Sequence, residues 1–138
     1  AGAARKPTEF EGAVMARDHF WLVPRDSLVA LRVHRRTGAA ESFSSWPAGF
    51  VKGPSAFIGA ACDGRYIYMP PYDATAVIGL DTTNGSMIAL SKWPTGFVMR
   101  SRAFAGGVFD GEAFVWMLPS LATCAVRINV TEGNHTMT

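Results

Sequence analysis

The sequence repeats itself at an interval of 47 residues. Phe10-Glu11-Gly12-Ala13 corresponds to Phe57-Ile58-Gly59-Ala60 and to Phe104-Ala105-Gly106-Gly107. The same interval relates Trp46-Pro47-Ala48-Gly49-Phe50 to Trp93-Pro94-Thr95-Gly96-Phe97. A fixed period of this size is the signature of an array in which each unit is one small supersecondary structure. We expect a single repeat domain over residues 1–138, with copies at approximately 7–54, 55–102 and 103–138, the last of them incomplete.

Each copy contains short apolar runs separated by turn signals. In the middle copy the runs cover residues 57–62, 65–69, 76–81 and 87–93. The dipeptides Asp-Gly and Asn-Gly lie between runs and favour tight hairpin turns, because they accept positive φ angles. No stretch sustains a 3.6-residue apolar period over three turns. We therefore predict an all-β protein with four antiparallel strands in each copy.

The repeat unit resembles the blade of a β-propeller. The resemblance is carried by Gly106-Gly107-Val108-Phe109-Asp110-Gly111, by the aromatic strand that follows, and by the turn Asp81-Thr82-Thr83-Asn84-Gly85. It is similar to kelch-like repeats and to blade repeats with an Asp-x-x-Thr-Gly turn. A kelch repeat carries a spaced Tyr and Trp after its glycine pair. Here the third copy has Trp116, the second has Tyr68, and the first lacks the double glycine.

Three copies are too few to close a propeller, which typically needs four to eight blades. The last copy reaches Thr138 without the Trp-Pro-x-Gly-Phe segment, and we expect it to lack its fourth strand. Three solutions stay open. The sequence is part of a longer repeat protein, or a second copy forms a homodimer that completes a six-blade ring, or the fold is a β-trefoil, whose three four-stranded units need no partner.

On the propeller interpretation, two classes of long loop share the face where ligands usually bind. One class connects successive copies, around residues 46–54 and 93–102, and the other connects the second and third strands of a copy. Exposed loops on a rigid scaffold are where binding residues concentrate. An aromatic and basic mixture suits an acidic peptide, a phosphorylated segment or a sugar acid. The candidate binding residues are Arg25, Phe50, Lys52, Tyr72, Asp73, Phe97, Arg100 and Arg102.

Other recurring residues have a purely structural interpretation. Trp46 and Trp93 recur at the repeat period, which favours packing between neighbouring copies over ligand stacking. Asp63 and Asp110 each precede a glycine, and we expect them to cap their own turns through hydrogen bonds from side chain to backbone. These residues require no ligand.

The sequence contains no arrangement typical of catalysis or of a metal site. Asp26 and Asp73 occupy equivalent loop positions and could bind a cation, but the third copy has Leu121 there, so turn formation is favoured. The histidines are unrelated by the repeat and lack paired ligand spacing. We predict no catalytic residue, no metal and no cofactor. The histidines are His19, His34 and His135.

Cysteines and asparagines bear on the compartment. Cys62 and Cys124 lie at different positions of neighbouring copies, beside alanine and apolar residues, so we expect free, buried thiols. All three asparagines begin glycosylation sequons, at Asn84, Asn129 and Asn134. Threonine-rich turns produce such matches by chance. We therefore favour a cytoplasmic location, with a secreted or cell-surface protein as the alternative.

Charge narrows the class of partner. The net charge is only +2, and three of the thirteen Lys and Arg residues, Arg32, Arg35 and Arg36, form a local cluster with His34. Nucleic-acid binding needs a wider basic surface with interleaved aromatics, and no apolar run approaches the ~18 residues of a membrane span. We expect a protein partner or a second copy of the chain, and neither nucleic acid nor membrane.

The sequence therefore favours a non-enzymatic β-repeat scaffold or protein-interaction module. Its first alternative is a carbohydrate-binding trefoil with sugar stacked on Trp21, Tyr68 or Trp116. Its second is a metal-dependent hydrolase or lactonase of propeller fold, in which Asp26 and Asp73 hold the metal.

Overall fold

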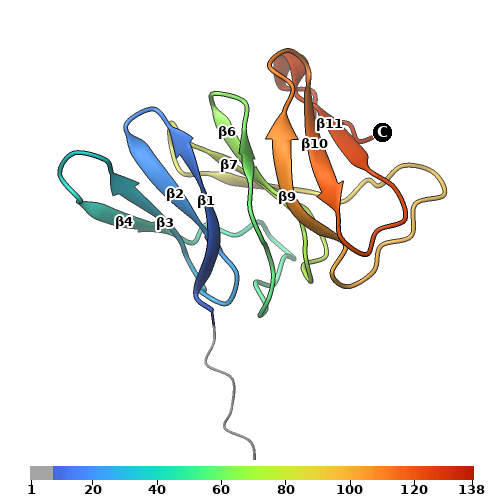
Figure 1. Cartoon of the computed structure of the whole chain (residues 1–138), viewed down its shortest axis with the longest axis horizontal. Helices are drawn as coiled ribbons and strands as arrows, with labels where there is room; N and C mark the ends of the chain where they lie inside the picture. The colour runs from blue at the N-terminus through green and yellow to red at the C-terminus, as the bar shows by residue number, and fades with distance from the viewer. Residues whose placement is uncertain (1–7) are drawn as a thin grey trace, which may run out of the picture.

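The computed structural model describes residues 8–138 as three antiparallel β-sheets that lie side by side in chain order (Figure 1). Each sheet is a meander in which strands adjacent in sequence are hydrogen-bonded. This is the predicted all-β, propeller-blade-like architecture, and the alternative prediction of a β-trefoil is wrong. Residues 1–7, which include the expected start of the first copy, lie outside the described residues.

Eleven strands build the described part of the chain. The first sheet, blue in Figure 1, contains β1 (Phe10–Ala16), β2 (His19–Pro24), β3 (Ala30–His34) and β4 (Ala40–Phe43). The middle sheet contains β5 (Ala61–Cys62), β6 (Tyr66–Met69), β7 (Val77–Asp81) and β8 (Met87–Leu90). The third sheet, orange to red, contains β9 (Phe104–Phe109), β10 (Phe114–Pro119) and β11 (Val126–Asn129), followed by one 3-10 turn (Thr131–Gly133).

Neighbouring copies touch through their backbones at one glycine of each copy, in or just before its first strand. Gly59 donates its N–H to the carbonyl of Glu11 at 3.0 Å, and Gly106 donates to the carbonyl of Ile58 at 2.6 Å. A Cβ atom on Gly12 would lie 2.8 Å from the Cα of Gly59, and a Cβ on Gly59 would lie 2.8 Å from the Cα of Gly106. No side chain fits at such a distance. The glycines recur every 47 residues because the backbones of neighbouring copies touch there.

Two predicted strands are shorter than the apolar runs suggested. The run at residues 57–62 forms a strand only at Ala61–Cys62, and Gly59, with a φ of +69°, lies just before it. Phe57 instead makes an isolated bridge to Pro71. The run at residues 87–93 ends as a strand at Leu90. A turn closed by Phe97 N–H and the carbonyl of Pro94 follows it.

The core consists of two apolar clusters, one at each junction of adjacent sheets. Trp46 stacks with Phe57 at a ring separation of 6.3 Å, and Trp93 stacks with Phe104 at 6.0 Å. The prediction that both tryptophans pack between neighbouring units is confirmed. Stacked aromatic pairs contribute about 0.5–1.5 kcal/mol beyond the area they bury.

Turns are fixed by side-chain acceptors, as predicted. Asp63 Oδ1 accepts the N–H groups of Arg65 and Tyr66, and Asp110 Oδ1 accepts three successive N–H groups. The sequon asparagines act in the same way, each accepting the N–H two residues further on, at Asn84, Asn129 and Asn134. Each sequon asparagine therefore forms an Asx turn, in which its side chain accepts the backbone N–H two positions later.

The third sheet has a partial fourth strand at its outer edge. Met137 bridges Ile128, and Thr138 exchanges N–H and carbonyl hydrogen bonds with Arg127 at 2.9 and 3.0 Å. The expectation that the last copy lacks its fourth strand is corrected to this extent, because residues 136–138 pair with β11 in its place.

Candidate functional site

The loops predicted to share one face do lie together. The carbonyl of Arg25 accepts the N–H of Ala56, and the carbonyl of Tyr72 accepts the N–H of Ala103, each at 3.0 Å. These bonds join the second-to-third strand loop of one sheet to the connection that enters the next sheet. The loops that contain the candidate binding residues therefore adjoin each other at both junctions.

Two aspartates fasten that surface. Asp26 accepts the N–H of Ser55 at 2.8 Å through Oδ1 and the N–H of Thr8 at 2.8 Å through Oδ2, and Asp73 Oδ1 accepts the N–H of Arg102 at 2.9 Å. The hydrogen bond from Ser55 is the main reason that the pKa of Asp26 lies below its usual value. These carboxylates connect neighbouring sheets, beyond the local turns predicted for them.

Lys52 is buried, which corrects its assignment as an exposed binding residue. Its side chain donates from Nζ to the carbonyl of Arg25 at 2.9 Å and to that of Gly53 at 2.8 Å, and the residue is only 9% exposed. Burial lowers the pKa of the Lys52 ammonium group to about 8, against the opposing attraction of Asp26 and Glu9. Lys52 therefore acts as an internal tie between two loops.

Three further candidates are half-buried and make contacts within the molecule. Arg25 forms an ion pair with Glu11, and its side chain is 14% exposed. Phe50 and Phe97 stack against Phe57 and Phe104 in the two aromatic groups of the core. These side chains hold the loops in place and leave little surface for a ligand.

The remaining four of the eight candidates are more accessible. Asp73, Arg100 and Arg102 are exposed, and Tyr72 is half-buried. Arg102 has a φ of 55°, in the left-handed region that a side chain other than glycine seldom adopts. The hydrogen bond from its N–H to Asp73 holds this conformation. The candidate site thus contracts to a basic platform, defined here as Tyr72, Arg100 and Arg102.

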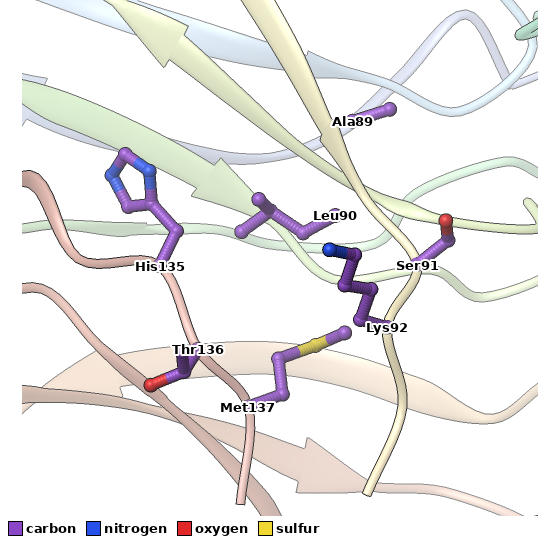
Figure 2. Close-up of a pocket in the computed structure, with 7 residues that line it drawn as sticks. All are labelled: Ala89, Leu90, Ser91, Lys92, His135, Thr136 and Met137. Atoms are coloured by element: carbon purple, nitrogen blue, oxygen red, sulfur yellow. The ribbon is translucent and has the colours of Figure 1, made fainter.

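A groove that sequence reasoning missed lies between β8 and the last residues of the chain (Figure 2). It has a volume of about 460 Å³. The imidazole of His135 packs edge-on against Tyr66 and Tyr68 at 5.2 and 5.9 Å, and burial lowers its pKa. In Figure 2 the Lys92 side chain extends toward Leu90, with the His135 ring beyond it.

The previous junction has a larger side chain at the position equivalent to Leu90 of the groove. At the junction of the first and middle sheets, the ring of Phe43 fills the corresponding space, and a Cβ on Gly85 would lie 2.6 Å from its Cδ1. Leu90 stands 47 residues after Phe43, and a Cβ on Gly133 would meet nothing within 4 Å. The smaller leucine was the available sequence signal.

The predicted basic cluster is largely neutralised by carboxylates. Arg32 pairs with Glu41, and Arg35 pairs with Asp18 at 3.0 Å. His34 accepts the N–H groups of Arg36 and Thr37 through Nδ1, which closes the turn after β3. This region therefore presents no broad positive surface.

The expectation of two buried thiols is corrected, because Cys62 is half-buried and Cys124 is exposed. His135 is half-buried. Within residues 8–138, no group of three or more His, Cys, Asp or Glu side chains comes together as a metal site would require. In the same range, no helix has the length and hydropathy to cross a membrane.

The outward faces of the first and third sheets expose large apolar side chains. On the third sheet, Trp116 is 36% exposed, Leu118 47% and Val108 52%. On the first sheet, Met15 is 43% and Phe20 42% exposed. Single exposed hydrophobics are ordinary, but contiguous apolar patches mark interaction sites.

The chain resembles solved structures in fold only. No protein-family model matches it, and no curated protein sequence does. Virginiamycin B lyase from Staphylococcus aureus is 13% identical, with 92% of this chain and 39% of that chain covered and a TM-score of 0.70. For hydrazine synthase from Kuenenia stuttgartiensis these values are 12%, 99%, 38% and 0.64. For an auxiliary nutrient binding protein from Bacteroides ovatus they are 13%, 98%, 32% and 0.63.

These likenesses establish a β-propeller-type fold. The chain spans less than half the length of each of the three structures. Two of the structures are named as enzymes and one as a nutrient-binding protein. The shared fold therefore does not select a function, which has to be argued from the site itself.

Proposed function

We propose that the chain is a non-enzymatic interaction module of the β-propeller type, built from three kelch-like copies, that binds an acidic segment of a protein partner on its basic platform. The observation that carries this proposal is the hydrogen bond of 2.9 Å between Asp73 and the N–H of Arg102. It ties an exposed arginine with a φ of 55° to the middle sheet, as Asp26 ties Ser55 with a φ of 49° one junction earlier. The loop that presents Arg102 is therefore fixed by a polar contact that occurs at both junctions.

The surroundings of the platform support the proposal. Lys52, Arg25, Phe50 and Phe97 fasten the adjoining loops from within, so the exposed side chains stand on a fixed base. Binding then costs little ordering of the backbone, and preorganisation of this kind increases affinity. Arg100 and Arg102 supply the charge, and Tyr72 supplies an aromatic surface with a polar hydroxyl group.

Neither alternative function gains a specific observation. The carbohydrate-binding hypothesis was tied to a trefoil, and the fold is of the propeller type. The hydrolase hypothesis required Asp26 and Asp73 as metal ligands, but both carboxylates already accept backbone hydrogen bonds.

Fluorescence anisotropy with labelled hexaglutamate tests the proposal directly. We expect binding at low ionic strength that weakens as salt rises, because exposed charges are screened. The double variant with Arg100→Ala and Arg102→Ala should lose this binding. Arg36→Ala, which removes an exposed arginine elsewhere, should retain it. Absence of binding at low salt, or equal binding by all three proteins, would refute the proposal.

A further inference from the structure

The junction between the first and middle sheets shows what one sheet requires of the next. The first sheet contributes alternate residues of β2 and β3, including Trp21 at 3% and Ala30 at 2% exposure. Successive residues of a strand point to opposite faces, so these side chains share the face toward the middle sheet. From the middle sheet, this cluster contains Ile67, Met69, Ile78, Leu80 and Met87.

The same arrangement recurs at the second junction. Tyr68, fully buried, and Val77 face the third sheet from positions 47 residues after Trp21 and Ala30. From the third sheet, side chains of β10 and β11 pack in the same cluster, namely Val115, Met117, Val126 and Ile128. One kind of interface therefore forms twice within the chain, always between the later face of one sheet and the earlier face of the next.

The outward face of the third sheet carries the first half of this interface. Trp116 is the third residue of β10, as Trp21 is of β2 and Tyr68 of β6. The guanidinium of Arg127 lies 5.3 Å from the Trp116 ring, as that of Arg32 lies 5.6 Å from the Trp21 ring. Yet Trp116 is 36% exposed, because no further sheet covers it in the described chain.

The outward face of the first sheet has the residue pattern of the other side of this interface. Its apolar residues stand 47 positions before those with which the middle sheet meets its neighbour. Phe20 corresponds to Ile67, Leu22 to Met69 and Leu31 to Ile78. An outward face that always met water would have polar residues here, since exposed sheet faces alternate with the buried ones in polarity. The apolar positions of this face are Phe10, Phe20, Leu22, Leu31 and Val33.

We infer that two copies of the chain form a dimer. In this dimer the outward face of the third sheet of each copy packs on the outward face of the first sheet of its partner. Each face lacks what the other supplies, and a second copy supplies both. The two contacts are equivalent by two-fold symmetry and close a ring of six sheets, within the range of propellers. Closure also avoids the open filaments that a single head-to-tail contact would generate.

Light scattering on a sizing column measures the state of the wild-type chain. We expect twice the chain mass of 14.8 kDa at micromolar concentration. A monomer over this range would overturn the inference, and so would a mass that rises without limit, because that would indicate an open assembly. A monomer that still binds hexaglutamate would leave the proposed function standing, whereas a dimer without that binding would leave only this inference.

Two variants test the pairing of the faces. Phe20→Lys alters only the first face and Trp116→Glu only the third, and each alone should give monomers, because both contacts contain the altered face. Their equimolar mixture should recover a dimer, because one contact is then free of both substitutions and the other pairs Lys with Glu. Circular dichroism establishes that each variant is folded.

The recovery on mixing distinguishes this arrangement from a dimer of like faces. If third sheets docked on each other, Trp116→Glu would give monomers, Phe20→Lys would remain dimeric, and mixing would restore nothing. Val51→Glu is the matched control, since Val51 is 84% exposed and lies outside both faces. A dimer that survives both face variants would also overturn the inference.

Discussion

The carboxylate of Asp73 accepts the backbone N–H of Arg102 at 2.9 Å and so ties the middle sheet to the strand that begins the third. Asp26 does the same for Ser55 one junction earlier, at 2.8 Å. Leu121 stands at the corresponding place after β10 and has no acceptor to offer. The two internal junctions thus share a polar tie that the outward face of the third sheet lacks.

Removing this tie should destabilise the protein. Asp73→Ala leaves one N–H without its charged acceptor, and Asp26→Ala leaves two. A hydrogen bond to a charged group is worth about 1.5–3 kcal/mol, so we expect Asp26→Ala to cost more than Asp73→Ala in urea unfolding. Asp18→Ala breaks only an exposed ion pair with Arg35 and should cost less than about 1 kcal/mol. Equal effects of the three substitutions would contradict the role of the tie.

Contact between first strands predicts a difference between two glycine substitutions. Gly59 and Gly64 both have positive φ, at +69° and +103°, so alanine strains the backbone at either position. Only at Gly59 would the new Cβ also clash, 2.8 Å from the Cα of Gly106. We expect Gly59→Ala to reduce the free energy of unfolding by about 1–3 kcal/mol more than Gly64→Ala. Similar thermal midpoints for the two variants would argue against backbone contact.

The burial of Lys52 predicts a dependence of stability on pH. Its pKa falls from 10.5 to about 8 in the folded protein. Between these values the unfolded chain binds more protons than the folded one, so the free energy of unfolding increases as pH rises from about 8 to 10.5. Lys52→Met removes this titration while keeping an unbranched apolar stem. Urea unfolding at several pH values should show a steeper rise for the wild type, and parallel curves would exclude a buried ammonium group.

The groove beside β8 predicts that a larger side chain can be added at little cost. Leu90→Phe places at this junction the ring that Phe43 places at the previous one, and filling a cavity commonly stabilises by about 0.5–2 kcal/mol. Phe43→Leu should have the opposite effect, because it opens a matching space. Differential scanning calorimetry on both variants decides the matter. A lower midpoint for Leu90→Phe would mean that the groove is closed in solution.

The two cysteines should differ in reactivity toward a thiol reagent. Cys124 is exposed, whereas burial raises the pKa of the Cys62 thiol and reduces its thiolate fraction. We expect one fast and one slow thiol with Ellman's reagent at neutral pH. Cys124→Ser should remove the fast phase, and Cys62→Ser should leave it. Loss of the fast phase in Cys62→Ser would reverse this assignment.

The sequence was informative wherever structure depends on local pattern. Gly12, Gly59 and Gly106 recur because one backbone contact recurs. The turn aspartates could be recognised because they accept hydrogen bonds from N–H groups a few residues away. The periodic tryptophans likewise predicted their packing. These features follow from spacing alone.

Contacts between distant segments could not be predicted from the sequence. Lys52 appeared to be an exposed basic residue, but its ammonium group donates to the carbonyl of Arg25, 27 positions earlier. Phe50 and Phe97 likewise appeared to be surface aromatics, because their stacking on Phe57 and Phe104 is visible only in the folded chain. The groove lies where Leu90 replaces the larger Phe43 of the previous copy, a difference whose effect can be judged only when the facing sheet is known.

Contact at the glycines has a consequence for how such a chain diverges. Because the sheets are held apart by main-chain atoms, whose size does not change with sequence, the distance between neighbouring sheets is independent of the side chains that fill the junction. Substitutions in the two apolar clusters can therefore accumulate while the geometry of the array persists. A fold shared with structures that are only 12–13% identical accords with this independence.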